Sequence, residues 1–133
     1  MLRRNLAVVF AIALGLIVLS AVAGAASTIS STVVLVDNKP ASEPDKTVFT
    51  MKVKSDAAKC ANNRDVKFSE RDQGTNDPFV KVAQGTTDDN GKVRKTINTK
   101  GFPDVKVTAL KKTFGPSGHR KTCTKASIIL TAH

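Results

Sequence analysis

The sequence predicts an all-β protein: a two-layer antiparallel β-sandwich of about seven strands with one disulfide, preceded by an N-terminal signal helix. Three observations support this prediction. Apolar residues recur with a period of two after residue 32, turn-forming residues separate these runs at the spacing usual in sandwiches, and the same region holds two cysteines. Because a short sheet needs a second layer to bury its apolar face, two packed antiparallel sheets are the simplest arrangement.

The first 26 residues have the organisation of a secretory signal peptide. Two arginines precede an apolar run over residues 6–23, and small residues follow it. We expect cleavage there, with Ala26 or Ser27 as the new N-terminus. An uncleaved anchor is the alternative, because about 20 apolar residues can span a bilayer. Both outcomes place the rest of the chain outside the cytoplasm, where it is secreted or held at the cell surface or in the periplasm.

The remaining residues, 27–133, are predicted to form one domain. Their number suits a single core of modest size and leaves no room for a second folded unit. Thiols tend to oxidise outside the cytoplasm, so Cys60 and Cys123 are predicted to form a disulfide that closes a long loop. A catalytic or metal-binding thiol pair has little support, because neither cysteine lies in a C-x-x-C motif or beside a histidine.

Alternation of apolar and polar residues identifies the strands along the chain. It is clearest over residues 47–54 and 104–110, with shorter stretches at 66–69, 80–82 and 93–97. The residues predicted to face the core are Phe49, Met51, Val53, Val66, Phe68, Val80, Val82, Val93, Ile97, Val105, Val107 and Ala109. The residues predicted to face solvent between them include Lys52, Lys54, Lys67, Ser69, Lys81, Lys106 and Thr108.

Two flanking apolar runs, residues 33–36 and 128–130, lack this alternation. They are predicted to be strands that are either covered on both faces or placed at a sheet edge. Residues 88–91 read Asp-Asp-Asn-Gly, the strongest turn signal in the chain, because Asn-Gly readily adopts the positive φ angles of tight turns. We expect a hairpin here that joins the strand near Val82 to a strand beginning at Lys92.

Three segments carry a resemblance to known domains: residues 60–68 (CANNRDVKF), 85–93 (GTTDDNGKV) and 104–109 (DVKVTA). Together they resemble the bacterial immunoglobulin-like and transthyretin-like (Big-type, carboxypeptidase-regulatory-like) secreted sandwiches. Those families carry a strand that ends in a TTD-x-n-G hairpin, then a strand, then one with a v-x-v-x-A pattern. The resemblance also implies a cysteine near the front of the module paired with one ahead of the last strand. These motifs specify a fold better than a function.

Residues that could support catalysis or bind a metal are scarce. His119 lies in a loop among glycine and basic residues, where a solvated side chain is the simplest interpretation, and His133 is the last residue. Asp88 and Asp89 suggest calcium, but calcium loops alternate their ligands, so a structural turn is favoured. Neutral-glycan recognition is not expected, because the chain has no Trp or Tyr to stack on sugars. We therefore expect no catalytic residue, metal or cofactor.

A surplus of positive charge is the main functional signal. Residues 27–133 keep all 11 acidic residues and lose only two arginines, which leaves a net charge of +8. This charge favours anionic partners, although it also serves solubility, and outward lysines keep sheet edges from pairing. Specific nucleic-acid binding is not expected, because no aromatic residues are interleaved with the basic ones. The residues proposed to bind anions are Lys92, Arg94, Lys111, Lys112, Arg120 and Lys121.

These features predict a non-enzymatic module outside the cytoplasm that acts as a structural or interaction unit. The first hypothesis is a protein partner or another component of the cell envelope. The alternative is capture of anionic polymers or a membrane surface through the basic loop and the lysine-rich strand faces. Apart from that alternative, membrane contact is expected only through the N-terminal segment if it is retained, and the protein is expected to be a monomer.

Overall fold

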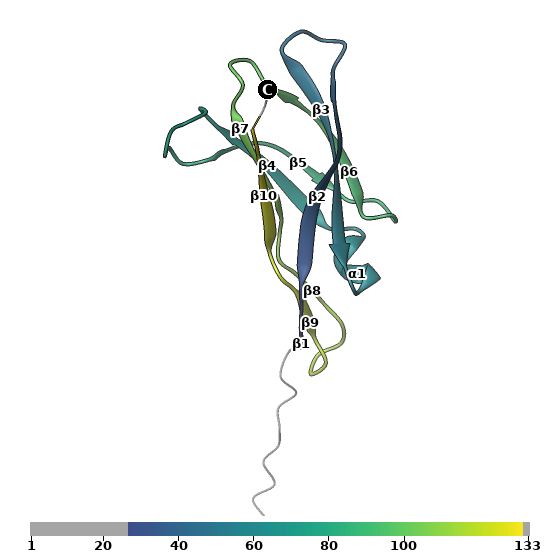
Figure 1. Ribbon diagram of the computed structural model, residues 1–133. Coiled ribbons are helices and arrows are strands. Elements are labelled where there is room, and N and C mark those ends of the chain that lie inside the picture. The colour runs from purple at the N-terminus through teal and green to yellow at the C-terminus, as the bar shows by residue number, and fades with distance from the viewer. Residues whose placement is uncertain (1–26, 132–133) are drawn as a thin grey trace, which may run out of the picture.

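The computed structural model describes residues 27–131, and within this range ten strands and one short helix are arranged in three sheets (Figure 1). The predicted signal segment, residues 1–26, lies outside the described residues. No helix within residues 27–131 is long and apolar enough to cross a bilayer.

Two sheets form the body of the protein, and all their neighbouring strands are antiparallel. The four-stranded sheet has the order β10 (Ala126–Thr131), β7 (Asp104–Ala109), β4 (Asp65–Arg71), β5 (Val80–Thr86). The three-stranded sheet has the order β2 (Ser31–Pro40), β3 (Lys46–Ser55), β6 (Lys92–Asn98). These seven strands confirm the predicted two-layer sandwich.

A third, small sheet lies at one end of the sandwich and was not predicted. Its strands are β1 (Ser27–Ile29), β9 (Lys121–Cys123) and β8 (Lys112–Phe114), next to the helix α1 (Ala58–Ala61) (Figure 1). The strands β1 and β9 are parallel, whereas β8 and β9 form an antiparallel hairpin. The disulfide between Cys60 of α1 and Cys123 of β9 confirms the predicted pairing, and its Cα atoms are 5.5 Å apart.

The core between the two large sheets contains ten of the twelve residues predicted to face it. Val80 and Val82 were predicted wrongly, because their exposed fractions are 65% and 42%. At Val82 the reason is a β-bulge: Phe68 pairs with Ala83, but Ser69 pairs with Lys81, which leaves Val82 as an extra residue. Ala83 packs against the core instead. Val80 pairs with Glu70 at the first position of the edge strand β5, where the core does not cover it.

Two small polar residues predicted to face solvent, Ser69 and Thr108, are buried. They lie on the outer face of the four-stranded sheet, where Ser69 has Lys81 and Lys106 as register partners. Thr108 shares a hydrogen bond of 3.0 Å with the hydroxyl of Ser127. We attribute their burial to the long aliphatic stems of the neighbouring lysines, which shield short side chains on a sheet face.

The two apolar runs without alternation lie in edge strands, which confirms that alternative. Residues 33–36 belong to β2 and residues 128–130 to β10, each the last strand of its sheet. On β10, Ile128 and Leu130 pack against the core, whereas Ile129 between them is exposed. An edge strand contacts the core with alternate residues only, so its other apolar side chains remain at the surface.

The turn at residues 88–91 is present, but the prediction of a hairpin was wrong. It joins β5 to β6, which belong to different sheets, so it carries the chain from one layer to the other. The carboxylate of Asp88 accepts hydrogen bonds from the backbone N–H groups of Asn90 (2.8 Å) and Lys92 (2.9 Å). Gly91 has a φ of 73°, and a Cβ there would lie 2.7 Å from the carbonyl oxygen of Val53.

We predict that this turn makes the free energy of unfolding decrease at acid pH. Backbone hydrogen bonds from Lys92 and then Asn90 lower the pKa of Asp88 below its ordinary value of 3.8. The stabilisation should therefore be complete above that ordinary value and disappear as pH falls through the lowered one. NMR titration of the Asp88 carboxyl carbon measures this directly. A pKa at or above 3.8 would contradict the prediction, and an Asp88→Asn variant should lack this part of the acid dependence.

Candidate anion-binding surfaces

The six residues proposed to bind anions lie in two separate groups. One group surrounds the β8–β9 hairpin at the disulfide end, and the other lies on β6 in the three-stranded sheet. The first group consists of Lys111, Lys112, Arg120 and Lys121, and the second of Lys92 and Arg94. The fold therefore does not bring them together as one site, and each group has to be judged by its own surroundings.

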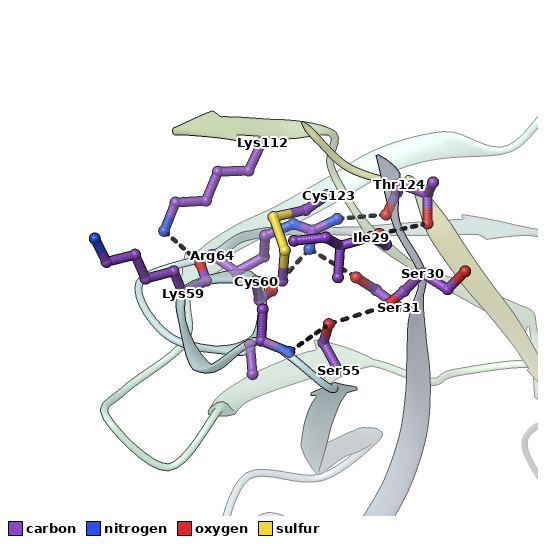
Figure 2. Close-up of a disulfide and its surroundings, with 12 residues drawn as sticks. Ile29, Ser30, Ser31, Ser55, Lys59, Cys60, Arg64, Lys112, Cys123 and Thr124 are labelled. Carbon is purple, nitrogen blue, oxygen red and sulfur yellow. Dashed lines mark hydrogen bonds between the residues drawn. A yellow bond between two sulfur atoms is a disulfide. The ribbon is translucent and has the colours of Figure 1, made fainter. Parts of the chain in front are cut away.

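Lys112 has a structural role within the first group. Its ammonium donates to the carbonyl oxygen of Lys59 at 3.0 Å (Figure 2). It also donates to the carbonyl oxygens of Asn62 at 3.0 Å and of Asn63 at 3.2 Å. An ammonium has three protons to donate, so these contacts use its full capacity. Lys112 ties α1 and the residues after it to β8, whereas Lys111, Arg120 and Lys121 are exposed.

The second group extends across two neighbouring strands. Lys52 of β3 and Lys92 of β6 are register partners, and Arg94 lies opposite Thr50 on the same outer face. Lys54 is two residues further along β3, so its side chain also points outward. Neighbouring strands are about 5 Å apart, and alternate residues of one strand are about 7 Å apart. The outer face of β3 and β6 therefore presents a grid of four closely spaced cations.

Electrostatics of this face are only partly balanced within the protein. The nearby acid is Asp88, whose carboxylate feels the positive charges of Lys92 and Lys52. Like charges directly opposite each other weaken a sheet. Arg94 and Lys54 form no ion pair among the described residues. The face thus retains a positive surplus at its exposed surface.

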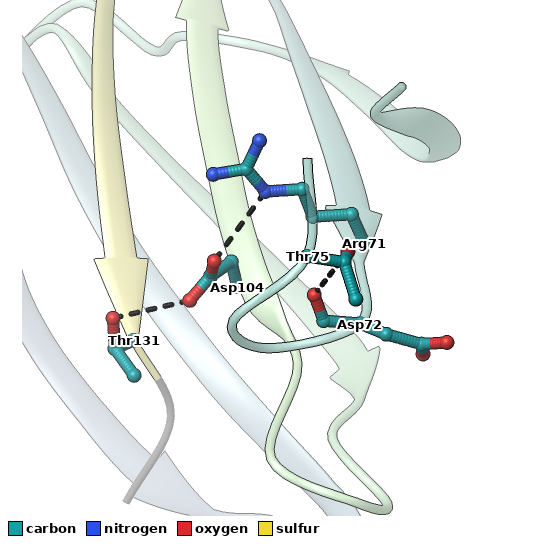
Figure 3. A network of polar contacts seen from close by, with 5 residues as sticks. All are labelled: Arg71, Asp72, Thr75, Asp104 and Thr131. Carbon is teal, nitrogen blue, oxygen red and sulfur yellow. Dashed lines mark hydrogen bonds and ion pairs between the residues drawn. The ribbon is translucent and has the colours of Figure 1, made fainter. Parts of the chain in front are cut away.

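The outer face of the four-stranded sheet uses its cations differently. The guanidinium of Arg71 lies 4.3 Å from the centre of the Phe79 ring and 3.4 Å from the carboxylate of Asp104. Lys106 lies over the same ring at 5.5 Å. Asp104 also accepts a hydrogen bond of 3.2 Å from Thr131 (Figure 3). Internal contacts therefore engage two cations of this face, Arg71 and Lys106.

Arg64 is the most important polar residue that the sequence analysis missed. Its guanidinium is completely buried and donates to the carbonyl oxygens of Leu110 (2.5 Å), Cys60 (2.7 Å) and Thr124 (2.6 Å). It also donates to the hydroxyl of Ser31 at 3.1 Å (Figure 2). Burial lowers the pKa of Arg64 below its ordinary value. Among residues 27–131 no carboxylate pairs with it.

The position of Arg64 makes it a clamp rather than a binding group. Its four acceptors belong to α1, to the start of β2, and to the segments that follow β7 and precede β10. All four segments meet beside the disulfide. One sequence signal could have found it: Arg64 has the same parity as Val66 and Phe68, so alternation predicts that it points inward.

The remaining candidates for chemistry do not form a site among the described residues. His119 is exposed in the β8–β9 loop, and its backbone N–H donates to the carbonyl oxygen of Pro116 at 3.0 Å. Within residues 27–131 no group of three potential metal ligands comes together. His133 lies outside this range. The absence of a catalytic centre and of a cofactor stays a prediction.

A cavity of about 510 Å³ opens at the end of the sandwich opposite the disulfide. Its walls include three carboxylates and two cations, with Arg71 already engaged by Asp104 and Phe79. The carboxylates are those of Glu70, Asp72 and Asp77. This mixture of charges does not favour an anion, so the cavity is not part of the candidate surface.

No family model, curated protein or solved structure matches the chain. The resemblance to immunoglobulin-like and transthyretin-like domains therefore stays a prediction. The disulfide is compatible with a location outside the cytoplasm.

Proposed function

We propose that the protein is a non-enzymatic binding module outside the cytoplasm that holds an anionic polymer of the cell envelope on the outer face of β3 and β6. The observation that carries this proposal is the register pairing of Lys52 with Lys92, flanked on the same face by Arg94. Like charges in this arrangement repel each other when the face is empty. A polyanion lying across the strands would replace that repulsion with attraction.

Other features of the chain support an anionic polymer as the partner. The net charge of residues 27–133 steers anions towards the domain, and salt screens this attraction. A sheet face is flat and extended, which suits a chain of repeating charges better than a small enclosed ligand. The N-terminal segment and the disulfide both support a place outside the cytoplasm.

Retention on immobilised heparin tests the proposal, with heparin as a defined polyanion. The Lys52→Glu/Lys92→Glu variant of the full chain should bind about tenfold more weakly at low salt, because several favourable charge contacts are lost or reversed. The Lys67→Glu/Lys81→Glu variant is the matched control, since it has the same net charge but alters the four-stranded sheet. Equal losses in the two variants would show that total charge alone drives binding and would contradict the proposal.

A protein partner is the second candidate, and the exposed valines of β5 favour it. Val80 and Val82 lie on an edge strand, where apolar side chains and unpaired backbone groups can receive another chain. Salt distinguishes the two candidates in the same experiment. A polyanion complex should dissociate as salt rises, whereas a defined envelope complex that resists moderate salt in the Lys52→Glu/Lys92→Glu variant would favour the protein partner.

A further inference from the structure

The parallel pairing of β1 with β9 determines which part of the domain faces its N-terminal segment. Ser27 pairs with Lys121 and Ile29 with Cys123, so the two strands enter the sandwich in the same direction. The loop before Lys121, residues 115–120, therefore lies beyond Ser27, at the end of the domain where β1 begins (Figure 1). The tip of the β8–β9 hairpin projects from the domain towards that side.

The small sheet of β1, β8 and β9 at this end of the domain has exposed cations on and around it and no carboxylate on its strands. Residues 27–36 and 105–131 contain no Asp or Glu, and these stretches supply β1, β8 and β9. Lys59 of α1 joins them, with its ammonium 5.6 Å from the centre of the Phe114 ring. None of these cations has an ion-pair partner among the described residues. The exposed cations nearest the hairpin and α1 are Lys59, Lys111, Arg120 and Lys121.

The sequence before Ser27 indicates which surface this end of the domain can contact. The apolar run over residues 6–23 is long enough to cross or enter a bilayer. The four steps of chain from Ala23 to Ser27 can span at most about 14 Å. A chain that keeps this run in a membrane therefore holds Ser27 close to the lipid headgroups, with the hairpin tip on the membrane side of Ser27.

We propose that, while the N-terminal segment is in the membrane, the hairpin end of the domain rests on anionic phospholipid headgroups. Arg120 and Lys121 on the hairpin, with Lys111 and Lys59 beside it, supply the attraction. The disulfide and Lys112 hold the hairpin against α1, so the cations approach the surface as a rigid unit. The contact does not depend on polymer binding at the outer face of β3 and β6.

The test uses the full chain reconstituted in phosphatidylcholine vesicles with and without phosphatidylglycerol. A fluorophore at Ser117→Cys on the hairpin tip reports contact through quenching by lipid-borne spin labels. A fluorophore at Ser42→Cys, in the loop between β2 and β3 at the opposite end, is the positional control (Figure 1). We expect stronger quenching at Ser117 when the lipid is anionic, and no such difference at Ser42.

Charge reversal shows whether the named residues cause the contact. In the Arg120→Glu/Lys121→Glu variant the contact equilibrium should fall by about fivefold for each cation lost. The Lys67→Glu/Lys81→Glu variant has the same net charge and should keep the contact. If the hairpin variant does not form the disulfide, Lys59→Glu/Lys111→Glu tests the same surface.

Three results would overturn the inference: equal quenching at Ser117 in neutral and anionic vesicles, an equal loss in the control variant, or equal quenching at Ser42. Failure of the polymer proposal would be a different result. It would appear in the Lys52→Glu/Lys92→Glu variant on heparin, and that variant should leave the Ser117 quenching unchanged.

Discussion

Replacing Arg64 with alanine should lower the free energy of unfolding by about 3 to 5 kcal/mol, the largest loss that we expect from a single substitution. The substitution removes the donors to three carbonyl oxygens and one hydroxyl, and the Arg64 side chain that supplies them is fully buried. Each buried acceptor left without a donor costs about 1 to 3 kcal/mol, and neighbouring losses do not simply add. The cavity left by the side chain adds to the cost.

Urea denaturation with the disulfide oxidised measures this effect. Arg64→Lys should be less damaging than Arg64→Ala, because an ammonium keeps the charge and some of the donors but lacks the fork of the guanidinium. Arg94→Ala is the exposed control, for which a change below about 0.5 kcal/mol is expected. A loss of that small size in Arg64→Ala would show that water or rearranged backbone satisfies the carbonyls, and the clamp would be disproved.

Alternation predicted much of the sandwich because a strand buried on one face has apolar residues at every second position of its sequence. Phe49, Met51 and Val53 on β3 show this clearly, as they face the core as the pattern predicted. The same rule would have placed Arg64 inward, but a charged residue is rarely fully buried without a paired acid. Here four neutral oxygen acceptors take the place of the acid. They come from segments far apart in the sequence, so no local sequence pattern predicts them.

The error at Val82 on β5 has a different cause. A β-bulge adds one residue to one strand, so the inward and outward positions exchange beyond it. The pairing of Phe68 with Ala83 and of Ser69 with Lys81 places this exchange at Val82. Composition gives no warning of it, since a valine suits either face of an edge strand.

The candidate site was only partly predictable because adjacency in sequence does not determine adjacency between sheets. Lys92 and Arg94 were expected to act with the loop cations, but their neighbours are Lys52 and Lys54 of β3. That partnership depends on the turn at residues 88–91 crossing from one sheet to the other rather than closing a hairpin. The third sheet was missed because strands of three residues are too short for a periodic signal.

Removing the disulfide should cost about 4 kcal/mol in the free energy of unfolding, by the loop-closure entropy of the unfolded chain. The bond joins residues 63 positions apart, so its loss gives the unfolded chain more conformational entropy. The Cys60→Ala/Cys123→Ala variant tests this in the same urea experiment. A loss below about 1 kcal/mol would mean that other contacts already restrain these segments in the unfolded chain.

The disulfide and Arg64 should also be coupled, because they hold the same end of the protein. Arg64 donates to the carbonyl oxygen of Cys60, and Cys123 belongs to the strand that pairs with β1. Without the bond, α1 and β9 can move apart, and part of the Arg64 contacts should already be lost. A double-mutant cycle should therefore give a combined loss smaller than the sum of the separate losses. Strict additivity would show that Arg64 stabilises the sandwich independently of the bridge, and the view of this end as one cooperative clamp would have to be abandoned.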